Sequence, residues 1–236
     1  MRLVTWNCCG GFLAKEPLLD KLTPDIAVIQ ECLRPKTETG QRLWFGGSKG
    51  KGLCVLANKA YRISALPQAP DAPQYVVPVE IRGPTNFVLI AVWAKVSSRY
   101  VRGVVRAVEL YRDLFQRNDT VVIGDINANK IWDKEHPAGQ NYSALVEKLS
   151  DLGLISSYHS YHGEAHGEET QATYYHSWKE QKPFHLDYCF IPKAWAKRVS
   201  RVDVGTYAEW RESSDHRPLL VELSEKQERL IPSVDV

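Results

Sequence analysis

The chain has 236 residues, of which 44% are hydrophobic and 25% are charged, with a formal net charge of +2 and a pI near 8.2. This is a globular composition, and so mild a charge neither requires nor excludes a nucleic-acid partner, because only the local field around a cleft steers an anion. Five scattered cysteines without a Cys-x-x-Cys pair argue against zinc pairs and against a disulfide framework.

Short apolar runs separated by turn signals predict strands at 3–6, 26–29, 53–57, 75–81, 87–93, 120–123, 173–175, 186–191, 199–204 and 219–223. Helical patterns are fewer and fall at 13–22, 99–116 and 142–152, while the polar, glycine-rich stretch 37–52 predicts a loop. Many strands with few long helices favour two packed sheets with helices on their outer faces. We expect one domain over 1–224 and a polar tail over 225–236.

The predicted helix 99–116 has two faces. Its apolar face consists of Val104, Val108, Tyr111 and Phe115, and another face carries Arg99, Arg102 and Arg106. The arginines suit either a nucleic-acid contact or a solvated helix face, and base rates favour the solvated face.

No secretory signal is visible, and the longest uncharged apolar run, 87–94, is too short to cross a bilayer. We therefore expect a cytoplasmic protein with no membrane span. A monomer is the default expectation.

Five polar clusters lie at or just beyond the ends of apolar runs. They are Thr5-Trp6-Asn7, Gln30-Glu31, Gly124-Asp125-Ile126-Asn127, His185-Leu186-Asp187-Tyr188 and Ser214-Asp215-His216. A single glutamate at a strand end is usually exposed or salt-bridged, and a single Asp-His pair is usually a structural hydrogen bond. Several such clusters on converging strands instead indicate a buried acidic site. The chemistry they suggest is metal-assisted attack of water on a phosphate ester.

In this order and at these separations, the clusters make the chain resemble the endonuclease/exonuclease/phosphatase superfamily, the DNase I-like phosphoesterases, over nearly its whole length. The resemblance implies an α/β (α+β) fold, a four-layer sandwich of two packed, mainly antiparallel sheets flanked by helices. It also implies a hydrolase of phosphoric ester bonds that depends on Mg²⁺ or Mn²⁺. Glu31 would bind the metal ion, with Asn7 and Asp215 helping directly or through water.

The same resemblance implies the catalytic roles. Asp125 would orient and deprotonate the attacking water, and Asn127 would contact the scissile phosphate. His216 would stabilise the developing charge on the phosphate and would itself be held by Asp187.

One position departs from the family pattern. Where relatives place a histidine or tyrosine near the phosphate, this chain has Trp93, whose indole N–H can donate a hydrogen bond but cannot transfer a proton. Trp93 is interpreted either as a substrate contact or as plain core packing, and Lys95 would supply charge nearby.

Aromatic and histidine residues near the predicted cleft bear on the substrate. Trp132 suits either stacking on a base or anchoring its own loop. The segment 158–176 carries four histidines, and we expect it to contact substrate, with His176 among the contacts. A second metal site at His162, Glu164 and His166 is the alternative, although the spacing matches no standard zinc motif.

The sequence therefore predicts a nuclease acting on DNA or RNA. The alternatives are a phosphatase or phosphodiesterase of a small-molecule or lipid head-group phosphoester, and an inactive binding protein of the same fold.

Overall fold

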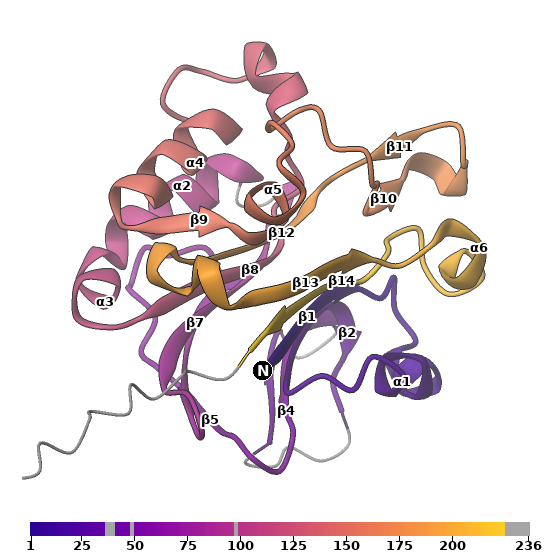
Figure 1. The fold of residues 1–236 in the computed structure, drawn as a ribbon, viewed down its shortest axis with the longest axis horizontal. Helices are drawn as coiled ribbons and strands as arrows, with labels where there is room; N and C mark the ends of the chain where they lie inside the picture. Colours follow the sequence, from indigo (N-terminus) through magenta and orange to yellow (C-terminus); the bar gives the residue numbers. More distant parts are fainter. Residues whose placement is uncertain (36–40, 48–49, 97–98, 225–236) are drawn as a thin grey trace, which may run out of the picture.

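Two six-stranded sheets pack face to face in the computed structural model, which describes residues 1–35, 41–47, 50–96 and 99–224 (Figure 1). The first sheet has the order β13 (Val199–Val204), β14 (Leu219–Leu223), β1 (Arg2–Asn7), β2 (Ile26–Leu33), β4 (Lys51–Ala57) and β3 (Arg42–Phe45). The second has the order β5 (Arg62–Ala65), β6 (Val76–Arg82), β7 (Phe87–Trp93), β8 (Thr120–Asp125), β12 (Asp187–Pro192) and β9 (Leu154–Ser156). A short hairpin pairs β10 (Tyr174–Tyr175) with β11 (Pro183–Phe184).

Each large sheet contains one parallel pair. β1 lies parallel to β2 in the first sheet and β7 parallel to β8 in the second, while the other neighbours are antiparallel. The prediction of two mainly antiparallel sheets is therefore confirmed.

Helices cover the outer faces of both sheets. The α-helices are α1 (Phe12–Asp20), α2 (Val101–Leu110), α3 (Arg112–Arg117), α4 (Tyr142–Asp151), α5 (Ser157–His162) and α6 (Tyr207–Trp210). Short 3₁₀ segments are η2 (Lys130–Glu135), η3 (His176–Trp178) and η4 (Lys193–Arg198). One core fills the space between the sheets, a second joins the second sheet to α2 and α4, and a third joins the first sheet to α1. These contacts make the four layers, and no helix among the described residues has the length and apolarity to span a bilayer.

Two predicted elements differ in the structure. The helix expected at 99–116 is two helices that meet at Tyr111, where the backbone leaves the helical region, although the predicted apolar face is buried. Of the stretch expected to be a loop at 37–52, residues 37–40 and 48–49 lie outside the described residues. The rest contains strand β3, which has only four residues and so carries too little pattern to be recognised, and the first two residues of β4. The predicted tail at 225–236 lies outside the described residues.

Candidate active site

On each sheet, the side chains that face the other sheet change from apolar to polar at one end of the sandwich. On β1 the row runs from Leu3 in the core to Asn7, and on β8 it runs from Val121 to Asp125. The two row ends meet, because Asn7 Nδ2 donates to Asp125 Oδ2 over 3.0 Å. The polar clusters of the sequence thus converge where the inter-sheet core stops.

Gln30 links the two sheets here, and Gly124 lies opposite Val92 on the neighbouring strand of the second sheet. Gln30 Nε2 donates to Thr5 Oγ1 at 2.9 Å and to the carbonyl of Val92 in the opposite sheet at 3.1 Å. Gly124 has a φ of +147°, and a Cβ there would lie 2.0 Å from the Val92 carbonyl oxygen. Only glycine fits this backbone and this gap, so the first residue of the Gly-Asp-x-Asn motif has a packing function.

Asp125 is fully buried and is surrounded by donors. Its carboxylate accepts hydrogen bonds from the backbone N–H of Asn127 at 2.9 Å, from Asn127 Nδ2 at 3.1 Å and from Asn7. Asn127 Nδ2 also donates to the carbonyl of Ala94 at 2.9 Å, which fixes the amide at the rim of β7. Burial raises the pKa of Asp125 to about 7, despite the opposing charge of His216. A carboxylate with that pKa can accept a proton near neutral pH.

His216 and Asp187 form a buried pair. The Nδ1 atom of His216 lies 2.9 Å from Asp187 Oδ2, and the backbone N–H of Asp187 donates to Thr173 Oγ1. Burial alone would lower the pKa of His216, but the charges of Asp187 and Asp125 outweigh it and raise the pKa to about 9. The ligand atoms of Asp125, Asp187 and His216 lie within 4.8 Å of one another, so we name these three residues the acidic group.

Ser214 ties the last motif to the first. Its Oγ donates to the carbonyl of Asn7 at 2.7 Å and accepts from the backbone N–H of His216 at 3.0 Å. The indole N–H of Trp6 reaches the carbonyl of His216 at 3.3 Å. Residues about 210 positions apart therefore set the position of the imidazole.

Glu31 lies at a bulge in β2. The β2–β4 register shifts between Ile29 and Cys32, and Glu31 has a φ of +57°, which turns its side chain toward the site. Glu31 Oε1 accepts from Asn7 Nδ2 at 3.3 Å, and Oε2 is paired with the ammonium of Lys51.

The carboxylates of Asp215 and Glu31 affect the same two neighbouring side chains, Cys9 and Tyr174. Burial is the largest cause that raises the pKa values of Cys9 and Tyr174. The negative charges of Asp215 and Glu31 both raise these two pKa values further, so both carboxylates lie near Cys9 and Tyr174. Neither carboxylate belongs to the acidic group, however. The donor chemistry fits Mg²⁺, since Glu31 and Asp215 offer hard carboxylate oxygens and this ion needs only one or two carboxylates besides water. Asn7 Oδ1 accepts from the backbone N–H of Cys9 at 3.1 Å and would exchange this bond to serve as a ligand. The ammonium of Lys51 on Glu31 also shows that the carboxylate can accommodate a cation.

Trp93 faces the core. Its ring is 5% exposed and packs against Tyr75 with ring centroids 4.8 Å apart, and the β7–β8 register places it opposite Asp125. Lys95 Nζ lies 4.0 Å from the centre of the Trp93 ring. This geometry favours the packing interpretation of Trp93 and places the charge of Lys95 at the rim.

Aromatic rings lead away from His216. Tyr174 packs against His216 at 4.6 Å between ring centroids, Phe184 follows at 6.4 Å, and Trp132 contacts Phe184 at 4.9 Å. His176 Nδ1 lies 3.1 Å from the Tyr174 hydroxyl. We call Tyr174, Phe184 and Trp132 the aromatic row. The sequence did not reveal Phe184, because a two-residue strand has no recognisable period.

The alternative metal set of the 158–176 segment is not brought together. His162 Nε2 lies 3.1 Å from the carbonyl of Val202, and Glu164 accepts from Tyr158 and Thr170. His166 turns instead toward His159.

The family model described as the Endonuclease/Exonuclease/phosphatase family matches residues 4–216. The chain belongs to this family. Membership places it in a class that hydrolyses phosphate esters and agrees with the resemblance carried by the five motifs. No curated protein matches the sequence.

Solved structures support the fold of this family member. A 3′-5′ exonuclease from Neisseria meningitidis superposes with a TM-score of 0.70 at 20% identity, covering 95% of this chain and 100% of its own. An AP endonuclease from Archaeoglobus fulgidus gives a TM-score of 0.70 at 17% identity, with coverages of 94% and 99%. The endonuclease domain of TRAS1, a telomere-specific non-LTR retrotransposon, gives 0.69 at 18% identity, with coverages of 96% and 99%. At these identities the likeness concerns the fold.

Proposed function

We propose that the protein is a divalent-metal-dependent phosphodiesterase that hydrolyses nucleic acid by in-line attack of water. The observation that carries this proposal is the hydrogen-bonded chain from Glu31 through Asn7 to Asp125, placed beside the His216–Asp187 pair. A proton acceptor, a cationic imidazole and a cation-binding carboxylate thus meet in one place.

Each side chain then has one task. Asp125 accepts the proton of the attacking water, and its three hydrogen bonds hold the carboxylate in a fixed orientation. Asn127 would contact the phosphate by exchanging its Nδ2–H bond to Ala94 or to Asp125 for one to a phosphate oxygen. Protonated His216 directs its Nε2–H at the phosphoryl oxygen on which charge develops. Asp187 keeps that imidazole oriented and charged.

The metal ligands would be Glu31, Asp215 and Asn7. Mg²⁺ or Mn²⁺ bound there supplies positive charge that stabilises the phosphoryl oxygens. For Glu31 to serve, the ammonium of Lys51 moves aside, and its 42% exposure leaves it free to do so.

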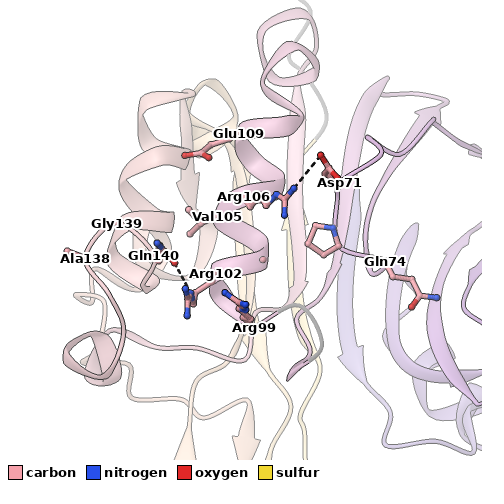
Figure 2. Close-up of a pocket in the computed structure, with 12 residues that line it drawn as sticks. Asp71, Gln74, Arg99, Arg102, Val105, Arg106, Glu109, Ala138, Gly139 and Gln140 are labelled. Carbon is pink, nitrogen blue, oxygen red and sulfur yellow. Dashed lines mark hydrogen bonds and ion pairs between the residues drawn. The ribbon is translucent and has the colours of Figure 1, made fainter.

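A nucleic-acid substrate is supported by a groove beside α2. The groove has a volume of about 890 Å³ and is lined by Arg99, Arg102 and Arg106, with Asp71 and Gln140 at its walls (Figure 2). Figure 2 shows Arg106 paired with Asp71, and Arg102 bonded to Gln140. Two acidic residues, Asp71 and Glu109, also line the groove, and Glu109 is paired with Lys148. The three arginines leave a net positive surface that suits a phosphate backbone.

Three further observations favour the same substrate. Arg99, in one wall of the groove, lies four residues after Lys95, whose neighbour Ala94 accepts a hydrogen bond from Asn127, so this wall is close in sequence to the proposed site. The aromatic row, with His176 bonded to Tyr174, offers ring faces on which a base can stack. Among the structural neighbours, a Neisseria 3′ phosphatase was solved bound to a product DNA hairpin.

The test is a substrate and metal matrix. The protein is incubated with plasmid DNA, single-stranded DNA, RNA and bis-p-nitrophenyl phosphate, each with Mg²⁺, Mn²⁺ or EDTA. We expect cleavage of a nucleic acid that EDTA abolishes. Turnover of the small ester alone would support the small-molecule alternative, and binding without turnover under every metal would support an inactive relative.

A further inference from the structure

A second histidine and carboxylate group lies away from the acidic group. His159 on α5 meets His166 and Glu169 from the loop that follows, and one ligand atom from each lies within 4.8 Å of the others. The side chains of His159 and Glu169 are only 7% and 4% exposed. We propose that these three side chains, here named the histidine group, bind a transition-metal ion, with zinc the ion that best suits two imidazoles and one carboxylate.

The hydrogen bonds around the group have the arrangement of an outer coordination shell. Each proposed ligand has its second polar atom held by a different residue. The pairs are His159 Nδ1 with Ser156 Oγ at 2.7 Å, His166 Nδ1 with Tyr142 Oη at 2.9 Å, and Glu169 Oε2 with Asn129 Nδ2 at 3.0 Å. Such contacts fix ring orientation and tautomer, leaving the second ring nitrogen for the ion.

A hydrogen-bond network alone explains only part of this geometry. His159 Nε2 lies 2.9 Å from Glu169 Oε1, which one shared proton accounts for. The ring of His166, however, stacks on His159 with centroids 3.6 Å apart, and its Nε2 has no hydrogen-bond partner among the described residues. An ion shared by the two imidazoles and the carboxylate gives His166 a partner. Binding through His159 Nε2 would place the proton of the neutral imidazole on Nδ1, where Ser156 Oγ accepts it.

The position of the group indicates a structural role. Glu169 holds Asn129, which follows the Asp125–Asn127 motif, and Asn129 Nδ2 also reaches the carbonyl of His185, two residues before Asp187. The ion would therefore fasten α5 and its loop to the two segments that carry the acidic group. Figure 1 shows α5 next to β12, in agreement with this connection.

Metal binding is measured on full-length protein without a polyhistidine tag, stripped with a chelator and titrated with Zn²⁺ alone or Co²⁺ alone. We expect one Zn²⁺ per chain, and a Co²⁺ complex with visible d–d absorption that added Zn²⁺ removes. His166→Gln removes one ligand at a partly exposed position. Its zinc affinity should fall by about 100-fold or more, because loss of an outer-shell partner alone costs about 10–100-fold.

Matched controls separate this site from others. His136→Gln changes a histidine outside the group, and Glu31→Gln changes the proposed Mg²⁺ site, so both should retain wild-type zinc affinity. If His166→Gln does not give a native circular dichroism spectrum, Tyr142→Phe replaces it, because that change removes one hydroxyl and should cost about 10-fold.

The proposal is overturned if the stripped wild-type protein takes up no Zn²⁺ at a one-to-one ratio. It is also overturned if His166→Gln, or Tyr142→Phe in its place, binds like the wild type, or if only Glu31→Gln loses the ion. These experiments measure metal binding and not hydrolysis. A negative result therefore counts against the zinc site without counting against the proposed phosphodiesterase activity.

Discussion

The acidic group and the histidine group use the same side-chain types in opposite proportions. The acidic group has two carboxylates and one imidazole, and their charges raise the pKa of His216 to about 9. The histidine group has one carboxylate and two imidazoles, and burial followed by the neighbouring His159 lowers the pKa of His166 to about 4. At neutral pH, His216 is a cation and His166 is neutral.

This difference separates what the two groups can bind. A buried imidazolium with carboxylate partners suits an anionic phosphate, whereas a neutral imidazole offers a lone pair to a metal ion. Burial would raise the pKa of Glu169, but hydrogen bonds from His159, the Gly167 backbone and Asn129 lower it to about 2, so the carboxylate stays charged. Burial lowers the pKa of both imidazoles, and the ratio of acids to histidines decides whether neighbouring charges oppose this effect, as at His216, or add to it, as at His166.

The largest expected effect comes from removing the cation of the acidic group. His216→Gln should lower the phosphodiesterase rate by about 10²–10³, or roughly 2.7–4 kcal/mol, because a developing charge loses its stabilising partner. Zinc binding at the histidine group should not change. Steady-state kinetics with circular dichroism measures this, and His136→Gln serves as the matched control. Wild-type turnover in a folded His216→Gln protein would contradict the role of His216.

A second substitution tests whether the acidic group needs the close contact between β8 and β7 at Gly124. Gly124→Ala should destabilise the protein by roughly 3 kcal/mol, because the new Cβ meets the Val92 carbonyl at 2.0 Å. Gly139→Ala is the control, since Gly139 also has a positive φ, of +75°, but has open space around it. Urea denaturation compares the two variants. Equal losses would mean that backbone conformation, and not the contact with the Val92 carbonyl on β7, dictates glycine at position 124.

Zinc should stabilise the fold through the histidine group alone. At a free concentration of about 100 Kd, a bound ion adds about 2.7 kcal/mol to the free energy of unfolding. Thermal unfolding of wild type and His216→Gln should therefore shift upward with Zn²⁺, while His166→Gln should not shift. If Zn²⁺ still raised the unfolding temperature of His166→Gln, zinc binding would not be specific to the histidine group.

The groove beside α2 extends the comparison to the substrate. Arg102→Ala should weaken nucleic-acid binding and reduce the slope of log K against log salt by about 1, because one phosphate contact is lost. Turnover of bis-p-nitrophenyl phosphate should stay at the wild-type value. An unchanged salt dependence would mean that Arg102 makes no phosphate contact and belongs to a solvated helix face, the interpretation that the sequence alone favours.

The smallest effect concerns Lys51. Lys51→Gln should lower the Mg²⁺ concentration needed for half-maximal activity by less than about 5-fold, because an exposed ion pair contributes about 0–1 kcal/mol. Metal titration of the activity measures this change. A higher Mg²⁺ requirement in the variant would show that Lys51 assists the ion and does not compete with it.

The sequence predicted the fold and the convergence of its motifs, because short apolar runs end in polar clusters that stand in the order of the family's motifs. Asn7, Asp125 and Asp187 belong to these clusters, and the structure brings them together. The sequence did not reveal that Lys51 pairs with Glu31, since that contact depends on the bulge in β2 and on the neighbouring strand.

The histidine group escaped prediction for a related reason. The sequence singled out His162, Glu164 and His166 as a possible metal set. In the structure the loop after α5 folds back, so that His166 and Glu169 lie beside His159 of α5, while His162 and Glu164 contact other residues. Irregular loops have no period to read, so their contacts are set by tertiary packing. The metal ion, the substrate, the single-domain boundary, the monomeric state and the cytoplasmic location stay predictions.

The most direct test of the central claim is cleavage of an end-labelled oligonucleotide under single-turnover conditions, with wild type and Asp125→Asn compared in Mg²⁺ and in EDTA. The account predicts cleavage by the wild type in Mg²⁺, none in EDTA, and a rate at least about 10²-fold lower for Asp125→Asn. Cleavage that persists in EDTA, or a folded Asp125→Asn protein as fast as the wild type, would contradict it.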